Sequence, residues 1–303
     1  MKIYDIASAD KFELSSTSGD LDYGHRIDKV LDEITDEFEN NSFSFTKSEL
    51  QEGFDLSDFS SVLASFNVHN ELNPRVWNNG IINSRVRLRL LDIADEFIDF
   101  LNIPWVKPED IILIGSLASY NWSKYSDFDL HILLDFKKVD KRTEFVAEYF
   151  DSKKTLWNDQ HESLKIYGFP VELYVQDTDG DCTASGIYSL TKNKWIKEPE
   201  VDDLKAIKLD KQTIKAKSLK FIKKIDKLYD EYRNETDTHK FEELSKKIKA
   251  LWDELKRTRK NSLKTGNEMS IGNLVWKCLR RLDYIEKLMD LKCKTYDKIN
   301  SIK

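Results

Sequence analysis

Two buried strands joined by a short turn are expected over residues 110–136, and this stretch constrains the fold more than any other part of the sequence. The apolar run Ile111–Ile114 is typical of a buried strand. Further along, Asp127 and Asp129 are separated by Phe128 and lead into a second apolar run. Side chains two residues apart on a strand point to the same face, so we expect the two carboxylates to project together, away from the core.

Two neighbouring carboxylates on a mostly apolar strand are unfavourable unless a positive charge lies beside them. A divalent cation supplies that charge, and Mg²⁺ prefers oxygen ligands. Gly115 follows the first strand and lets the backbone approach a ligand closely. Ser116 offers a hydroxyl and an N–H at an expected helix start, where phosphate binds well. The pattern therefore predicts a site for a metal ion and a triphosphate.

The order of these features resembles the signature of the DNA polymerase β-type nucleotidyltransferase superfamily. That signature is a strand, a Gly-Ser turn, a short helix and then a strand with an acidic-x-acidic motif. Gly115 and Ser116 match the turn, and Asp127 and Asp129 match the acidic motif. The resemblance covers roughly residues 85–176. The helices that follow are also similar to those of uncharacterised phage-encoded transferases, without a discrete motif.

The resemblance implies a reaction in which an acceptor hydroxyl attacks the α-phosphate of a nucleoside triphosphate (NTP) and pyrophosphate leaves. Two Mg²⁺ ions, or Mn²⁺ in their place, are the implied cofactors. Asp127 and Asp129 would bridge the ions, and Glu172 would bind the ion on the acceptor side. Gly115 and Ser116 would hold the β- and γ-phosphates.

A third carboxylate on a later strand is usual in the family, and Glu172 in the alternating segment 169–176 supplies one. The alternation predicts that Glu172 and Tyr174 share one face of that strand. A structural Glu paired with a lysine is the other interpretation of this residue. Asp177 and Asp179 in the following turn are the alternative third carboxylates.

Three residues near the acidic motif are further candidates for the site. We assign Lys124 and Ser126 to nucleotide binding, although Lys124 could also be solvated and Ser126 could brace the start of the strand. His131 shares the parity of the two Asp residues, so it lies near the site or serves as a structural histidine. The aromatic residues around them either stack on a base or pack the short helix onto the sheet: Tyr120, Trp122, Tyr125, Tyr188 and Trp195.

We expect an α+β fold, in which a small mixed β-sheet nucleotidyltransferase core with flanking helices is followed by a C-terminal helical bundle. The expected divisions are an N-terminal helical extension over 1–70, a catalytic domain over 71–200 and a helical domain over 201–303. Hydrophobic spacing predicts an amphipathic helix over about 23–39 in the extension.

The same spacing predicts two helices that flank the sheet and three that form the bundle. One runs from Ser84, as its N-cap, to Leu101. Another runs from Thr143 to about His161, with Phe145, Tyr149, Leu156 and Trp157 available for packing. The bundle helices are expected over 204–234, over about 238–258, and from Ser270 to about Met289.

The net charge of −6 conceals an asymmetry along the chain. Residues 1–204 carry 21 Lys and Arg against 39 Asp and Glu, whereas residues 205–303 carry 27 against 15. The basic part either binds RNA as an acceptor or is a solvated, Lys-rich bundle. The candidate phosphate contacts are Lys223, Lys224, Lys227, Lys246, Lys247, Lys249, Arg257, Arg259 and Lys260.

Composition limits the cellular setting and the kinds of metal site. The sequence has no apolar run of membrane-spanning length and no apolar N-terminal signal, so we expect a cytoplasmic protein without a membrane partner. Its three cysteines are Cys182, Cys278 and Cys293, an odd number without the spacing of metal ligands, and a zinc site is therefore not expected.

Three functions remain open at this point. The first is a nucleotidyltransferase that acts on RNA, a nucleotide or a small molecule. The second is a protein NMP-transferase that modifies a Ser, Thr or Tyr side chain. The third is an inactive transferase fold that serves as a binding or antitoxin module. Retention of all three carboxylates argues against the third, and the basic helices favour a nucleic-acid acceptor over a protein.

Overall fold

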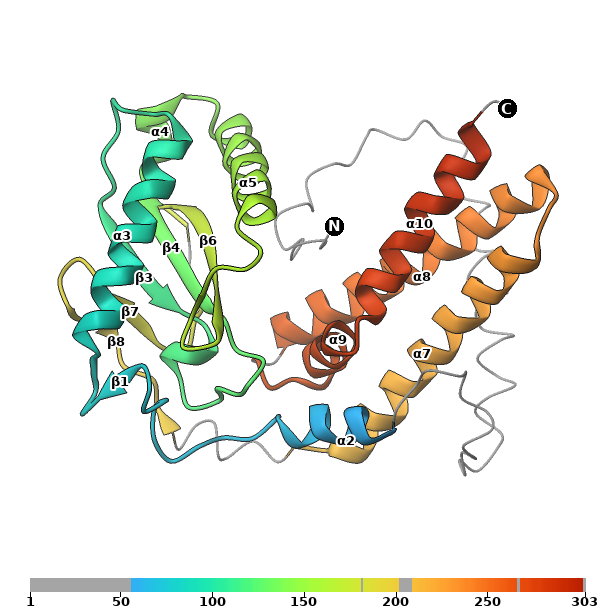
Figure 1. Ribbon diagram of the computed structural model, residues 1–303, viewed down its shortest axis with the longest axis horizontal. Coiled ribbons are helices and arrows are strands. Elements are labelled where there is room, and N and C mark those ends of the chain that lie inside the picture. The colour runs from blue at the N-terminus through green and yellow to red at the C-terminus, as the bar shows by residue number, and fades with distance from the viewer. Residues whose placement is uncertain (1–55, 181, 202–208, 266–267, 302–303) are drawn as a thin grey trace. The chain divides into compact units, whose positions relative to one another are not determined.

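This computed structural model describes residues 56–180, 182–201, 209–265 and 268–301 of the chain. The described residues form two compact units. One unit, from residue 64 to residue 201, contains a sheet with flanking helices, and the other is helical and consists of residues 56–63 and 209–301 (Figure 1). The predicted α+β fold with C-terminal helices is thus confirmed. The helix expected over 23–39 lies outside the described residues.

Within the described residues, the first unit holds a six-stranded sheet with the strand order β5-β6-β4-β3-β7-β8. β4 and β6 are parallel and the other neighbouring pairs are antiparallel, so the sheet is mixed, as predicted. The strands are β3 (Asp110–Ile114), β4 (Phe128–Leu134), β5 (Lys165–Ile166), β6 (Phe169–Asp177), β7 (Ile187–Ser189) and β8 (Lys194–Lys197).

A short hairpin made of β1 (Trp77–Asn78) and β2 (Ile81–Ile82) precedes the sheet. Its turn residues Asn79 and Gly80 have φ values of 50° and 77°, the left-handed conformations that two-residue hairpins favour. The indole N–H of Trp195 on β8 donates to the carbonyl of Gly80 at 2.7 Å. The hairpin is therefore tied to one edge strand of the sheet.

Helix α3 (Ser84–Leu101) has the bounds that the hydrophobic spacing predicts. Its N-cap, however, is Asn83, whose side chain accepts a hydrogen bond from the N–H of Arg85 at 2.9 Å. The assignment of Ser84 was wrong by one residue because Asn and Ser are both favourable caps and stand side by side here. The buried stripe is the one expected from a 3.6-residue period: Val86, Leu90, Ile93, Ala94, Phe97 and Leu101.

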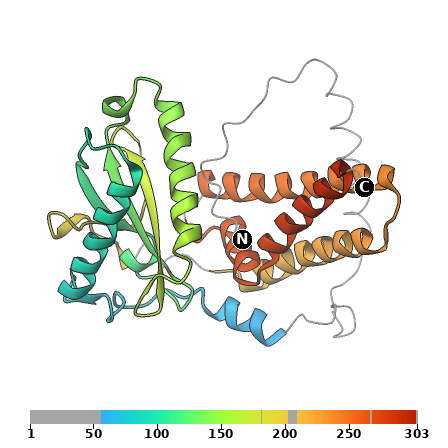
Figure 2. The ribbon, with the colours of Figure 1, turned by 45° about the horizontal axis from the view of Figure 1, so that its top comes forward.

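In helix α5 (Thr143–Gln160), Tyr149 and Trp157 pack on the core as predicted, whereas Phe145 and Leu156 do not. Phe145 and Leu156 are exposed, because each is displaced by about 100° from a neighbour on the buried side. Trp157 packs on Phe97 of α3 with 5.4 Å between the ring centroids, and Figure 2 shows both helices running alongside the strands. The buried residues are Val146, Phe150, Lys154, Trp157 and Asn158.

The two central strands separate an apolar face from a polar face. On β4 the residues Phe128, Leu130, Ile132 and Leu134 are buried, whereas the residues between them are only half-buried. On β6 the buried positions alternate with half-buried ones in the same way. The apolar face packs with α3 and α5 in one core cluster, which leaves the polar side chains of both strands together on the other face.

The helical unit contains α2, α7, α8, α9 and α10 (Figure 1). The predicted third bundle helix is wrong in one respect: it consists of two helices, because Asp283 between them has a left-handed φ of 60° that interrupts the hydrogen-bond ladder. The helices of this unit are α2 (Leu56–Ala64), α7 (Lys211–Asn234), α8 (Thr238–Thr265), α9 (Ile271–Arg281) and α10 (Tyr284–Asn300). The sheet unit also contains the short helices η3 (Ser116–Ala118) and α4 (Phe136–Val139).

Gly272 explains how closely α8 and α9 approach each other. Its N–H donates to the hydroxyl of Ser262 at 3.0 Å. A Cβ at this position would lie 2.8 Å from the carbonyl oxygen of Thr258, so a larger residue would push the two helices apart.

None of the helices in the described part of the chain combines the length and apolarity that a membrane crossing needs.

Candidate metal centre

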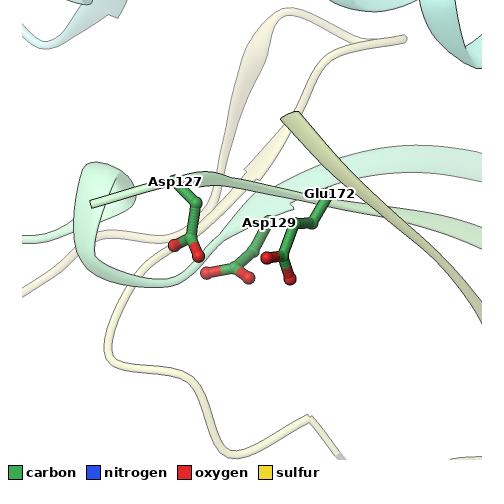
Figure 3. Close-up of side chains that lie close together, drawn as sticks. All are labelled: Asp127, Asp129 and Glu172. Atoms are coloured by element: carbon green, nitrogen blue, oxygen red, sulfur yellow. The ribbon is translucent and has the colours of Figure 1, made fainter. Parts of the chain in front are cut away.

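Three carboxylates meet on the polar face of the sheet. Asp127 directly precedes β4, Asp129 lies on β4, and Glu172 lies on the parallel neighbour β6 in register with Asp129. One oxygen of each residue lies within 4.8 Å of the corresponding oxygens of the other two, and all three residues are half-buried. Figure 3 shows the three carboxylates pointing to the same side of their strands.

This group could bind a divalent metal ion. Its three potential ligands are hard carboxylate oxygens, which Mg²⁺ and Mn²⁺ accept readily. Two oxygens bound to one Mg²⁺ lie roughly 3 to 4 Å apart, given metal–oxygen distances of about 2.1 Å. The observed separations therefore require only small side-chain movements to surround an ion. Without a cation the three like charges repel each other.

Gly115 places the end of β3 directly against Asp129. Its φ is 77°, in the left-handed region that favours glycine, and β3 pairs Ile114 with Asp129. A Cβ on Gly115 would lie 1.8 Å from Oδ2 of Asp129. No side chain fits between this backbone and the carboxylate. Glycine is thus required here for the position of Asp129, whereas its predicted contact with phosphate stays a prediction.

Ser116 starts the expected short helix, η3, which has three residues. Its hydroxyl lies 2.7 Å from the hydroxyl of Ser126, a buried residue just before β4. The N–H of Ser123 also donates to the Ser126 hydroxyl, at 2.9 Å. Ser126 thereby links the Gly-Ser turn to the loop that carries Asp127, which supports the bracing interpretation; nucleotide binding by Ser126 stays a prediction.

Two contacts hold the Gly-Ser turn from outside the motif. The indole N–H of Trp77 donates to the carbonyl of Leu117 at 2.7 Å. Gly186 lies so close to the turn that a Cβ there would be 2.0 Å from the carbonyl oxygen of Ala118. Both residues come from distant parts of the sequence, and no local signal identifies them as supports of the site.

Three of the candidate aromatic residues, Trp122, Tyr188 and Trp195, pack against other rings in this structure. Trp122 stacks on His69 with 3.8 Å between the ring centroids. Tyr188 is buried, and Trp195 stacks on Trp77 with a separation of 4.6 Å. Lys124 is exposed, and its ammonium group lies 4.9 Å from the ring centroid of the adjacent Tyr125. The proposed phosphate contact of Lys124 remains a prediction.

A second group of side chains on the polar face continues from the carboxylates along β4 and β6. His131 stacks on Tyr174 at 4.7 Å, and its Nδ1 lies 2.8 Å from the side-chain oxygen of Gln176. Burial lowers the pKa of His131 to about 4; the positive charge of Lys154 acts in the same direction, and the hydrogen bond to Gln176 opposes it. The imidazole is therefore neutral at pH 7.

Tyr174 joins this second group to the carboxylates, because its hydroxyl donates to Oε2 of Glu172 at 2.7 Å. The sequence placed Tyr174 and Glu172 on one face but did not identify this bond. The alternative third carboxylates lie elsewhere: Asp179 forms an ion pair with Lys137 at 2.6 Å, and Asp177 accepts from the N–H of Phe136 at 3.3 Å. Glu172 is the residue that joins the two Asp side chains.

Comparisons with known proteins leave the family of this chain open. No protein-family model matches it, and no curated protein matches it. Among solved structures, the STING-associated CdnE c-di-GMP synthase from Capnocytophaga granulosa is similar over 90% of this chain and 93% of its own, with 14% sequence identity and a TM-score of 0.19. A likeness of this size carries no argument about activity.

Proposed function

We propose that this protein is a metal-dependent nucleotidyltransferase that moves a nucleoside monophosphate from an NTP to an acceptor hydroxyl and releases pyrophosphate. The observation that carries the proposal is the cluster of Asp127, Asp129 and Glu172 across β4 and β6. The adjacent Gly115–Ser116 turn supports it, because this combination resembles the signature of DNA polymerase β-type nucleotidyltransferases.

The chain's own residues have distinct roles in this proposal. Asp127 just before β4 and Asp129 on β4 would hold the ions, and Glu172 on the neighbouring strand β6 would orient the ion on the acceptor side. Bound Mg²⁺ or Mn²⁺ would supply positive charge to the entering and leaving oxygens. Gly115 and Ser116 present backbone N–H groups to the terminal phosphates, and Ser126 keeps that turn in place through its hydroxyl.

The acceptor that we favour is a hydroxyl of RNA or of a nucleotide. Residues 205–303 are rich in lysine, but several of the candidate phosphate contacts are engaged within the helical unit. Lys224 pairs with Glu254 at 3.1 Å, and Lys247 pairs with Glu231 at 2.9 Å. These pairs reduce the positive charge that the helices offer to RNA. If the helices bind RNA, the affinity will fall steeply between 50 and 200 mM salt, as counterion release requires.

Incubation with each α-labelled NTP and Mg²⁺, in the presence of total RNA, free nucleotides or a protein extract, tests the proposal. We expect label to appear in RNA or in a nucleotide product. Glu172→Gln is expected to retain NTP binding and lose transfer, because the amide preserves the shape of the side chain and removes its charge. Glu162→Gln, which alters an exposed carboxylate of the same unit, is the matched control.

Each outcome of this experiment discriminates between functions. Label in protein would support the NMP-transferase alternative. Absence of transfer to every acceptor class, together with absence of metal-dependent NTP binding, would support an inactive binding module. Full activity of Glu172→Gln would show that the site is built differently from the arrangement proposed here.

A further inference from the structure

Glu172 has a hydrogen-bond donor beside it on its own strand. Tyr174 follows two residues later on the same face of β6 and donates its hydroxyl to Oε2 of Glu172 at 2.7 Å. A separation of this length is typical of the short, strong bonds that hydroxyl groups form with ionised carboxylates. Oε2 of Glu172 therefore already accepts one hydrogen bond within the sheet, so Oε1 has more lone-pair capacity to offer an ion.

The ring of Tyr174 is held in place by its neighbours. His131 on β4 is paired in register with Tyr174, and the two rings stack at 4.7 Å with 18° between their planes. The hydrogen bond between His131 and Gln176 orients the imidazole in turn. A ring confined in this way cannot swing its hydroxyl away from Glu172 without breaking the stack.

Lys154 adds a positive charge at the face of the same ring. This residue lies on the buried side of α5 and is only 5% exposed, and its ammonium group is 3.5 Å from the ring centroid of Tyr174. A cation in this position is attracted to the face of the ring, and its positive charge favours the partial negative charge on the phenol oxygen, which makes the hydroxyl a better donor. The charge of Lys154 thereby strengthens the bond from Tyr174 to Glu172.

We propose that Tyr174 is a positioning residue that restricts Glu172 to coordination through one oxygen, and that it thereby selects Mg²⁺ or Mn²⁺ over Ca²⁺. The inference rests on the proposed function, because it assumes a metal ion at the carboxylate cluster. Mg²⁺ requires an octahedral shell of about six single oxygens, whereas Ca²⁺ takes six to eight oxygens and often binds both oxygens of a carboxylate. A Glu172 side chain that offers one oxygen fits the smaller ion.

Metal titrations of the full-length protein test the proposal without reference to activity. The metal-free protein is titrated with MgCl₂, MnCl₂ and CaCl₂ separately, by calorimetry and by displacement of Mn²⁺ followed by electron paramagnetic resonance. We expect the wild type to bind Mg²⁺ more tightly than Ca²⁺. In Tyr174→Phe, we expect the ratio of Ca²⁺ to Mg²⁺ affinity to rise by about tenfold, the lower end of the effects seen for groups that orient metal ligands.

Two further variants separate this role from a general loss of structure. Tyr149→Phe removes another half-buried tyrosine hydroxyl of the same unit, which donates to the carbonyl of Leu101 at 2.6 Å, and should leave the ratio unchanged. In a Glu172→Gln background, Tyr174→Phe should no longer alter the ratio, because Tyr174 acts through that carboxylate. Circular dichroism and the melting temperature of each metal-free variant verify that it is folded.

The outcomes distinguish failure of the inference from failure of the proposed function. An unchanged ratio in folded Tyr174→Phe, or a wild type that prefers Ca²⁺, overturns the inference and leaves the metal centre in place. If Tyr174→Phe does not fold, the ion preference of the wild type alone decides whether the inference stands. A wild type that binds none of the three ions overturns the proposed function and the inference together.

Discussion

A buried carboxylate of the helical unit and the carboxylate cluster of the sheet unit have different neighbours. In the helical unit, Asp226 on α7 is buried and meets two donors from α10, the ammonium group of Lys287 and the hydroxyl of Tyr284, the latter at 3.2 Å. Burial and the charge of Asp226 both raise the pKa of Tyr284, so this phenol remains a donor. The carboxylate charge is balanced inside the unit.

The sheet unit gathers three carboxylates within 4.8 Å of one another instead. The hydroxyl of Tyr174 engages one oxygen of Glu172, and the ammonium group of Lys154 lies 3.5 Å from the centroid of the Tyr174 ring. Clustering of like charges costs stability in the absence of a cation. Asp226 thus has the partners of a structural carboxylate, whereas the cluster of Asp127, Asp129 and Glu172 is an arrangement that could bind a cation.

The largest expected effect follows from removing two members of the cluster. Asp127→Ala combined with Asp129→Ala should lower nucleotidyl transfer by a factor on the order of 10³ or more, equivalent to about 4 kcal/mol of transition-state stabilisation. Transfer from an α-labelled NTP measures this effect. The melting temperature of the metal-free variant should not fall, since the change relieves repulsion. Turnover at the wild-type rate would refute the assignment of both residues.

The next effect tests the comparison itself. Asp226→Asn should lower the free energy of unfolding by about 2 kcal/mol, less than for a fully buried pair because the Lys287 side chain is 29% exposed. In metal-free protein, Asp129→Asn should leave that free energy unchanged or raise it by up to about 1 kcal/mol. Urea unfolding measures both.

Asp290→Asn serves as the matched control in the helical unit. Asp290 forms an exposed i,i+4 pair with Lys294, and such pairs contribute little to stability. If Asp129→Asn and Asp226→Asn destabilise the metal-free protein equally, the proposed contrast between a structural carboxylate and a binding cluster is wrong.

A smaller effect is expected at Gly115. Gly115→Ala brings a methyl group onto Oδ2 of Asp129 and should weaken metal binding by about tenfold, or about 1.4 kcal/mol, by displacing that carboxylate. Gly80→Ala is a matched control, because Gly80 has the same φ of 77° and open space around it. Both variants place a methyl group at a positive φ, but only Gly115→Ala adds the clash with Asp129, which calorimetry with Mg²⁺ detects. Equal affinities in the two variants would contradict this explanation.

The smallest effect concerns Cys278 in the helical core, which is fully buried on α9. Burial raises the pKa of its thiol from 9.0 to about 11. As the pH rises, the thiol therefore loses its proton in the unfolded chain before it does so in the folded protein. Its contribution to the free energy of unfolding is fully present below pH 9 and is lost as the pH rises toward 11. We expect the thiol to contribute a loss of about 1 kcal/mol between pH 9 and pH 10.

Denaturation of Cys278→Ala at both pH values measures that contribution, because the variant should lose less stability than the wild type over the same interval. Cys293→Ala is the control, since Cys293 is exposed on α10. An identical pH dependence for wild type and Cys278→Ala would show that the helical core admits water at this position.

Local periodicity determined much of the architecture of this protein. The period of two on β4 and β6 separates Asp129 and Glu172 from the buried residues of both strands. The period of 3.6 accounts for α3 and its buried stripe. These features follow from the sequence because they depend on neighbours only a few residues away, whose relative directions the backbone geometry dictates.

The tertiary structure alone decided which distant groups meet. The contact of Gly115 with Asp129, the bond from Trp77 to Leu117, and the rotation of α5 that buries Lys154 depend on how separate elements pack. A helical period defines the faces of a helix but not which face the sheet will cover. The bond from Tyr174 to Glu172 likewise depends on neighbours, because His131 confines the ring from another strand. Such contacts are set by packing across the fold, which no local pattern encodes.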